Sequence, residues 1–150
     1  MKIQKKDGKT LFSVIDLGSH SVRMEIVQID PDGKCDVLEN VSNSIPIGRD
    51  VFTKGRITPE STSLVAKILC DYRRIMKDYG VESFKAVATS AVREASNRDI
   101  FLERIEHLSR IRLDVLEASE EVRLIYLTVK DTLEKKYPLS KQDAVICIIG

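Results

Sequence analysis

The fold of this chain is decided by Val14-Ile15-Asp16-Leu17-Gly18-Ser19-His20-Ser21-Val22-Arg23. In this stretch an apolar run ends in an acid and a turn of small residues, and a second apolar run follows at once. β-Branched and aromatic residues in and around both runs predict two neighbouring strands joined as a hairpin. Because glycine lacks a Cβ and hydroxyls add donors to exposed N–H groups, the turn Gly18–Ser21 is predicted to hold an anion, with phosphate favoured.

Two simpler interpretations of this stretch stay open. Hairpins need tight turns, and that need alone accounts for a glycine followed by serines. Asp16 ends the first predicted strand. Its carboxylate is predicted either to hold a hydrated divalent cation beside the phosphate or to tie the turn together through its own backbone.

The composition of the 150 residues, 43% hydrophobic and 31% charged, predicts one soluble globular domain with its own core. No apolar run has the length of a membrane span, and the charged first residues lack the apolar core of a secretory signal. We therefore expect a cytoplasmic protein without a membrane partner. The formal net charge of only +1 provides no global basic field, so DNA is not an expected partner.

The three cysteines, Cys35, Cys70 and Cys147, lack the paired spacing of a zinc site and the density of a disulfide scaffold. We expect them to be reduced thiols, two of them in the core.

A third strand is predicted over 34–41, and the short turns between the first three strands make them antiparallel. The following stretch, 43–56, contains glycine and proline and mixed polarity, and it is predicted to be a long surface connection. Its cations Arg49, Lys54 and Arg56 are expected to be solvated, or one of them faces the site.

Helices and strands are predicted to alternate from there on. A helix begins at Thr58-Pro59-Glu60 and ends at Gly80, and a second helix is capped by Asn97. A third helix is capped by Ser119 and runs to about residue 134. Short strands are expected over 84–88, 113–116 and 144–149. The predicted inner faces are Leu64, Ile68, Tyr72, Ile75, Met76 and Tyr79 in the first helix, and Ile100, Phe101, Ile105 and Leu108 in the second.

This order predicts an α/β fold with a mixed sheet of five to six strands and helices packed on it. By analogy, the pattern matches the half-domain of the actin-like, ribonuclease H-like phosphotransferases. In such open sheets ligands bind at the carboxyl ends of strands.

Polar groups follow three of the predicted strands: the turn at Gly18, the stretch Thr89-Ser90-Ala91-Val92-Arg93-Glu94, and Ser119-Glu120-Glu121-Val122-Arg123. Hydroxyls, backbone N–H groups and a guanidinium of the second stretch are predicted to converge on an oxyanion. Acids in a first helical turn are ordinary because they complement the helix dipole. If one of them points at the phosphate instead, it can take a proton from an attacking water, while Arg93 neutralises the phosphoryl oxygens.

Three motifs together resemble the exopolyphosphatase/guanosine pentaphosphate phosphohydrolase (Ppx/GppA) family, and the likeness runs from about Phe12 to Gly150. They are Ile15-Asp16-Leu17-Gly18-Ser19-His20-Ser21, Ala86 to Ala95 with Asn97-Arg98-Asp99, and Glu120-Glu121-Val122-Arg123-Leu124-Ile125-Tyr126. Three separated motifs in the right order are more specific than one glycine turn.

The resemblance implies an actin-like fold that removes terminal phosphate from inorganic polyphosphate or from guanosine pentaphosphate, with magnesium as cofactor. The partners it implies are polyphosphate or guanosine penta- or tetraphosphate. It implies that Glu121 is the catalytic base and Arg93 the arginine that binds phosphate. Gly18, Ser19, His20 and Ser21 correspond to the first phosphate loop, and Asp16 to its metal-binding acid. Arg23 stands near the phosphates in some relatives, and Thr89 and Ser90 complete the expected phosphate site.

Two positions depart from the family pattern. His20 replaces an asparagine, and it keeps a hydrogen-bond donor. Ile148 stands where the second phosphate loop of the family has an aspartate, if Gly150 is that loop's first glycine.

The chain is expected to be a flexible segment, 1–10, followed by the actin-like phosphatase domain, 11–150, which stops before the second phosphate loop. A missing half-domain would close the cleft, so the isolated chain is expected to be a poor catalyst. An open sheet edge makes a homodimer an expected state of such a piece.

Two other functions fit the same scaffold. A non-catalytic module that senses phosphate or a nucleotide would keep the fold and lose the metal-binding acid. Half of an ATP-using sugar or acetate kinase fits the fold but not the motifs around Arg93 and Glu121.

Overall fold

The computed structural model describes residues 9–136, with side chains up to residue 132. It divides the chain after Val115 into two compact units, each described by itself. The first contains β1 (Thr10–Leu17), β2 (Ser21–Ile29), β3 (Cys35–Ser44), α1 (Ile47–Lys54), α2 (Pro59–Tyr79), β4 (Ser83–Ala88), α3 (Ser90–Glu94), α4 (Arg98–Ser109) and β5 (Asp114–Val115); the second contains α5 (Ala118–Lys136).

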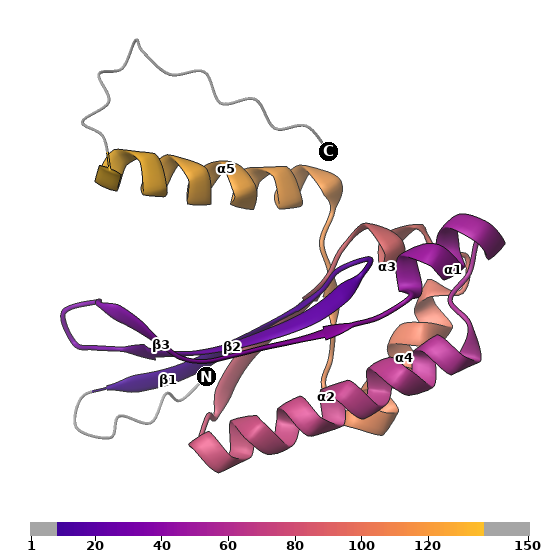
Figure 1. Cartoon of the computed structure of the whole chain (residues 1–150), viewed down its shortest axis with the longest axis horizontal. Coiled ribbons are helices and arrows are strands. Elements are labelled where there is room, and N and C mark those ends of the chain that lie inside the picture. Colours follow the sequence, from indigo (N-terminus) through magenta and orange to yellow (C-terminus); the bar gives the residue numbers. More distant parts are fainter. Residues whose placement is uncertain (1–8, 137–150) are drawn as a thin grey trace, which may run out of the picture. The chain divides into compact units, whose positions relative to one another are not determined.

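The described strands form one mixed sheet in the order β3-β2-β1-β4-β5. The pairs β1–β2 and β2–β3 are antiparallel, whereas β4 runs parallel to both β1 and β5. Figure 1 shows the long β1–β3 meander, with α2 and α4 on one side of the sheet. The predicted mixed α/β sheet is therefore confirmed, with five strands in the described part of the chain.

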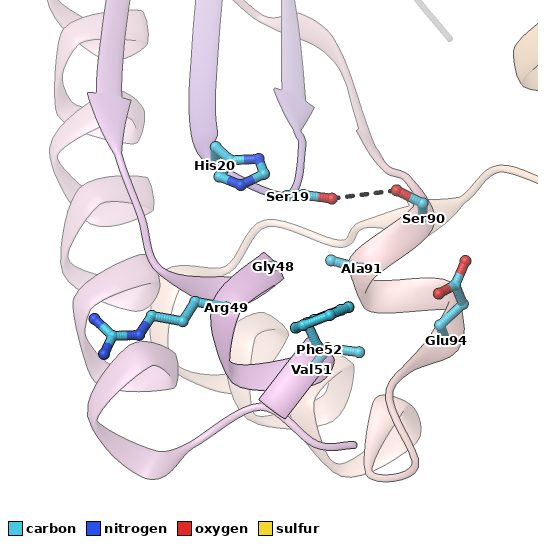
Figure 2. Close-up of a pocket in the computed structure, with 9 residues that line it drawn as sticks. All are labelled: Ser19, His20, Gly48, Arg49, Val51, Phe52, Ser90, Ala91 and Glu94. Atoms are coloured by element: carbon cyan, nitrogen blue, oxygen red, sulfur yellow. Dashed lines mark hydrogen bonds between the residues drawn. The ribbon is translucent and has the colours of Figure 1, made fainter. Parts of the chain in front are cut away.

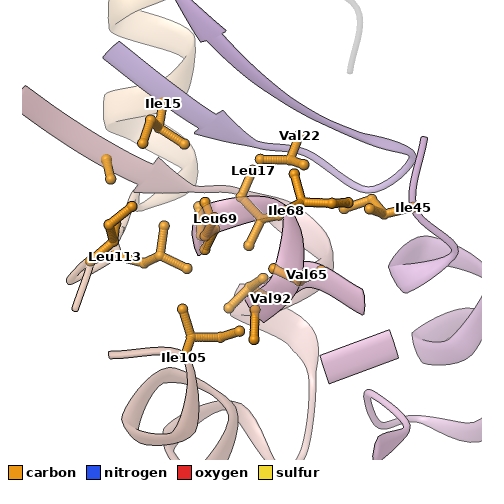
Figure 3. Packing of buried hydrophobic residues seen from close by; sticks show 14 of the residues in the cluster. Ile15, Leu17, Val22, Ile45, Val65, Ile68, Leu69, Val92, Ile105 and Leu113 are labelled. Atoms are coloured by element: carbon orange, nitrogen blue, oxygen red, sulfur yellow. The ribbon is translucent and has the colours of Figure 1, made fainter. Parts of the chain in front are cut away.

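The core lies on one face of this sheet. Residues alternate between the faces of a strand, so Ile15 and Leu17 of β1 point to the buried side. Val65 and Leu69 of α2 and Ile105 of α4 pack against this side (Figure 3). The hydroxyl of Tyr72 donates to the carbonyl of Val22 at 2.9 Å, which fixes α2 over the hairpin.

Both predicted ends of α2 are confirmed. Thr58 accepts a hydrogen bond from the N–H of Ser61, Pro59 occupies the first helical position, and Gly80 ends the helix at φ 75°. The inner face is rotated from the predicted one: Leu64 and Tyr79 are exposed, and the buried apolar residues are Val65, Ala66, Ile68, Leu69, Tyr72 and Met76.

The surface connection predicted over 43–56 is wrong. Strand β3 continues to Ser44, and Ile47–Lys54 form α1, which ends at Gly55 with φ 67°. Pro46 precedes the helix, and no side chain caps it. Its stability comes from packing, because Ile47 and Asp50 are buried. Residues 47–54 therefore carry no local sequence signal that predicts a helix.

The predicted start of the second helix is confirmed, because Asn97 is the residue that directly precedes α4, but its side chain does not make the predicted cap. Its amide instead exchanges two hydrogen bonds with the backbone of Ile57, at 2.9 and 2.8 Å. The predicted start of the third helix is wrong. Ser119 lies inside α5, which begins at Ala118.

The remaining corrections concern burial and length. Ile100 and Leu108 of α4 are exposed, 69% and 47%, and the buried apolar residues of this helix are Phe101 and Ile105, with Leu102 packed against the core. The strand expected over 113–116 is shortened to β5. The two described cysteines, Cys35 and Cys70, are free but exposed, against the expectation of core thiols.

Other expectations fall on parts of the chain outside the described residues. These are the strand over 144–149, Cys147, the departure at Ile148, and the segment 1–10 as far as residue 8; β1 already begins at Thr10. Between residues 9 and 136, none of the helices has the length and apolar character needed to cross a membrane.

Candidate active site

The carboxyl ends of β1 and β4 lie side by side because the two strands are parallel neighbours. Leu17 is in register with Ala88, and the N–H of Thr89 donates to the carbonyl of Leu17 at 3.2 Å. The turn after β1 and the start of α3 therefore meet at one edge of the sheet. There the hydroxyls of Ser19 and Ser90 lie within hydrogen-bond distance, at 3.2 Å.

Three backbone hydrogen bonds hold the turn after β1 in place. The N–H of Gly18 donates to the carbonyl of Ser21 at 2.9 Å, which closes the turn itself. Ile45 donates to the carbonyl of His20 at 2.9 Å, and Gly48 donates to that of Ser19 at 2.7 Å. The start of α1 thus supports the turn.

Glycine at position 48 is required by this contact. A Cβ added there would lie 2.9 Å from both the Cβ and the carbonyl oxygen of Ser19, closer than real Cβ atoms approach. The absence of a side chain lets α1 reach the backbone of the turn.

A pocket of about 520 Å³ opens between the turn, α1 and α3 (Figure 2). The Ser19–Ser90 pair lies on one side of it, with His20 beside it, and the guanidinium of Arg49 extends away from that pair. The lining residues are Ser19, His20, Gly48, Arg49, Val51, Phe52, Ser90, Ala91 and Glu94.

The pocket brings together three of the predicted site residues, Ser19, His20 and Ser90. Gly18 and Ser21 form the turn beneath it, and Thr89 joins the ends of β1 and β4. Their assignment to phosphate stays a prediction.

The other predicted site residues do not line this pocket. Asp16 is partly buried on the face of the sheet opposite Ile15 and Leu17, and the register places it directly across from Arg23. Arg93 is partly buried on α3. Glu121 belongs to the second unit, so its approach to the phosphate site stays a prediction as well.

A network of hydrogen bonds to a carboxylate joins α1, which lines the pocket, to the start of α2. Asp50 of α1 accepts hydrogen bonds from the hydroxyls of Ser61, at 2.5 Å, and Thr58, at 2.7 Å, and from the N–H of Thr58. Burial by itself would raise the pKa of Asp50, but these hydrogen bonds outweigh it and lower the pKa below its ordinary value. Asp50 is therefore a charged link between α1 and the start of α2.

The described residues hold no cluster of three or more histidine, cysteine, aspartate or glutamate side chains suited to a metal. A hard divalent cation that arrives with phosphates needs only one or two carboxylates, because phosphate oxygens and water complete its shell. Glu94 lines the pocket, whereas Asp16, at the end of β1, does not. Asp16 as a ligand of a divalent cation therefore stays a prediction.

Sequence reasoning missed Gly48, Val51 and Phe52 as members of the site. They reach the pocket only because 47–54 form a helix, and that helix was not predicted. For Arg49, the expectation left open that it faces the site, and its side chain does line the pocket.

Comparison with known proteins identifies relatives along most of the chain. The model of the Ppx/GppA phosphatase family matches residues 26–140. Exopolyphosphatase 1 of Mycobacterium leprae is 29% identical over 117 residues, which are 78% of this chain and 34% of that protein. The guanosine-5'-triphosphate,3'-diphosphate pyrophosphatase of Aliivibrio fischeri is 28% identical over 122 residues, 81% of this chain and 24% of that protein.

Solved structures agree with this result. The Ppx/GppA family member of Aquifex aeolicus has a TM-score of 0.77 and 32% identity, with 84% of this chain and 41% of that chain covered. An exopolyphosphatase from Cytophaga hutchinsonii has a TM-score of 0.76 and 30% identity, with 81% and 39% covered. The actin-like fold is confirmed, and the chain spans about a quarter to two fifths of the length of these relatives.

Proposed function

The chain belongs to the Ppx/GppA phosphatase family, and from this premise we propose that it carries part of the active site of a phosphohydrolase. The enzyme would remove the terminal phosphate of inorganic polyphosphate or of guanosine pentaphosphate (pppGpp). The names of the relatives support both substrates, because one is an exopolyphosphatase and another a guanosine-5'-triphosphate,3'-diphosphate pyrophosphatase.

One observation carries this proposal: the hydroxyls of Ser19 and Ser90 meet at 3.2 Å on the wall of a pocket. They come from residues 71 positions apart, at the ends of two parallel strands. Two convergent hydroxyls can each donate a hydrogen bond to an oxygen of one phosphate. In phosphoryl transfer such positioning supplies most of the catalysis, because the protein does little covalent chemistry.

Glu121 and Arg93 are assigned the chemical roles by the family motifs. The carboxylate of Glu121 would accept a proton from water as the water oxygen forms its bond to the terminal phosphorus. The bond from that phosphorus to the bridging oxygen breaks, and the shortened chain leaves with the electron pair. The guanidinium of Arg93 would neutralise charge on the phosphoryl oxygens.

The carboxylate of Asp16 would hold a magnesium ion, which would supply further neutralisation of negative charge.

The test is orthophosphate release from long-chain polyphosphate and from pppGpp by the protein that contains this chain. Glu121→Ala is expected to abolish release while the circular dichroism spectrum and the free energy of unfolding stay unchanged. Glu120→Ala is the matched control, because the carboxylate of Glu120 is engaged with Arg123 at 2.8 and 3.0 Å. The control should retain most of the activity.

Unchanged turnover in Glu121→Ala would remove this residue from the mechanism. Binding of polyphosphate without any release by the unmodified protein would instead favour the sensing module.

A further inference from the structure

Phe52 is an apolar side chain that the proposed phosphate chemistry does not use. It lies on α1 beside Val51, lines the pocket, and is 92% exposed. A second phenylalanine, Phe101, is buried in the core, and a third, Phe84, is only 38% exposed. Single exposed apolar residues are normal on protein surfaces, so the exposure alone means little. Its position on the wall of the pocket is the informative observation.

The pocket has two chemically different parts. Hydroxyls and an imidazole, from Ser19, Ser90 and His20, lie around the turn after β1. The apolar lining comes from Val51, Phe52 and Ala91, and Figure 2 shows the ring of Phe52 between α1 and α3, on the side where Ala91 lies. One ligand that occupies the whole pocket therefore needs an anionic end and an apolar, flat end.

Inorganic polyphosphate does not match the second part. Each of its units is charged and hydrated, so contact with an aromatic ring removes water from phosphate without a compensating hydrogen bond. The volume of about 520 Å³ lies in the range of sites for small organic ligands, well above the need of one phosphate.

A nucleoside polyphosphate does match both parts. Its phosphates can reach the two hydroxyls while its planar base covers the ring of Phe52. Stacking of a base on an aromatic side chain is favourable for every base, since each has a π-face, and it removes water from the ring face that the base covers.

We propose that Phe52 is a specificity-determining residue whose ring stacks on the purine base of a nucleoside polyphosphate, so that this site prefers guanosine polyphosphates to inorganic polyphosphate. The inference rests on the proposed function, because it uses the same phosphate site. According to this inference, a residue of α1 determines whether the site prefers guanosine polyphosphates or inorganic polyphosphate.

The first experiment compares two probes that differ only by the nucleoside. Guanosine 5'-triphosphate and inorganic tripolyphosphate are titrated into the full 150-residue chain by calorimetry. Phe52→Ala is expected to weaken binding of guanosine 5'-triphosphate about tenfold, the lower part of the range for base stacking, and to leave tripolyphosphate binding unchanged. Ile100→Ala, which truncates an exposed residue of α4 outside the pocket, is the matched control and should change neither.

A second variant reads the stacking directly. The chain contains no tryptophan, so Phe52→Trp introduces a single indole at the proposed contact. Its fluorescence should be quenched by guanosine 5'-triphosphate and not by tripolyphosphate, with the affinity of the original chain retained.

The outcomes separate this inference from the proposed function. Equal losses for both probes in Phe52→Ala, or quenching by both in Phe52→Trp, would overturn the role in base recognition and leave the phosphate site intact. If the original chain bound guanosine 5'-triphosphate no more tightly than tripolyphosphate, the role of Phe52 in base recognition would also be overturned, and the phosphate site would remain. Binding of neither probe by the original chain would overturn the phosphate site itself.

Discussion

At the scale of single residues, the site depends on a close backbone approach. Gly48 donates its N–H to the carbonyl of Ser19 at 2.7 Å, and this contact holds the turn that carries one of the two convergent hydroxyls. The space around Gly48 admits no Cβ. Gly48 has no side chain, and for that reason it can support the backbone of Ser19 beside the pocket.

Gly48→Ala is expected to destabilise the protein by about 1–3 kcal/mol, because the new methyl group collides with backbone that cannot move freely. Helix propensity alone predicts the opposite sign, a gain of about 0.5–1 kcal/mol for alanine in a helix. The free energy of unfolding in urea decides between them. Gly18→Ala is the stability control, since its Cβ would lie at an ordinary 3.4 Å from the carbonyl oxygen of Ser21. A gain in stability for Gly48→Ala would refute the steric argument.

Prediction from the sequence worked at the residue scale where a side chain carries its own chemical signal. Ser19 and Ser90 were recognisable because hydroxyls follow apolar strands, and the structure does bring them together. Gly48 and Phe52 gave no such signal. Their importance comes from what lies next to them in space, and Ser19 lies 29 positions from Gly48 in the chain.

At the scale of elements, a buried carboxylate joins α1 to α2. Asp50 of α1 is 8% exposed and accepts hydrogen bonds from the backbone and hydroxyl of Thr58 and the hydroxyl of Ser61, at the N-terminus of α2. A negative charge is favourable there because the helix dipole is positive at its start. The orientation of α1, and with it the apolar wall of the pocket, depends on this link.

Asp50→Ala is expected to lower the free energy of unfolding by about 2 kcal/mol at pH 7, because several hydrogen bonds to a charged group are lost. The pKa of Asp50 is lower in the folded protein than its ordinary 3.8. Its contribution is therefore complete above that value and is lost as the pH falls through the folded pKa. Urea unfolding at pH 7 and at about pH 3 measures both effects.

The difference between Asp50→Ala and the original chain should shrink at the lower pH. Asp99→Ala, which removes an exposed carboxylate with 89% of its side chain accessible, should cost little at either pH. An equal cost of Asp50→Ala at both pH values would show that packing, rather than charge, dominates.

Elements were predictable from the sequence when their own residues determine them. Helix α2 has a capping threonine, a proline at its first position and a terminal glycine, and both of its ends were predicted correctly. Helix α1 is short, contains Gly48 and lacks a side-chain cap. Tertiary contacts stabilise this helix, and a periodic pattern over eight residues cannot predict such contacts.

At the scale of the whole molecule, the core belongs to the first unit. Every member of the buried apolar cluster in the described residues lies between Ile15 and Leu113. The candidate catalytic base Glu121 comes after the boundary at Val115. The candidate pocket and the proposed base therefore belong to different units.

Removal of residues 116–150 is expected to leave a cooperative unfolding transition and tripolyphosphate binding, because the core and the pocket lining are retained. The same truncation should abolish orthophosphate release in the protein that contains the chain. Urea denaturation, calorimetry and a phosphate-release assay measure the three properties. Loss of cooperative unfolding in the truncated chain would show that the first unit does not fold on its own.

The parallel pairing of β1 with β4 has a consequence for the order of events during folding. The β1–β3 meander forms from segments adjacent in the chain, whereas β4 reaches β1 only after the intervening residues have been looped out, at a cost in chain entropy. The hydroxyl of Ser19 comes within hydrogen-bond distance of that of Ser90 only once β4 has joined β1. We therefore expect a newly synthesised chain to form the proposed phosphate site only after β4 has joined β1. We expect a bound phosphate compound to prolong the lifetime of the native state rather than to speed its formation.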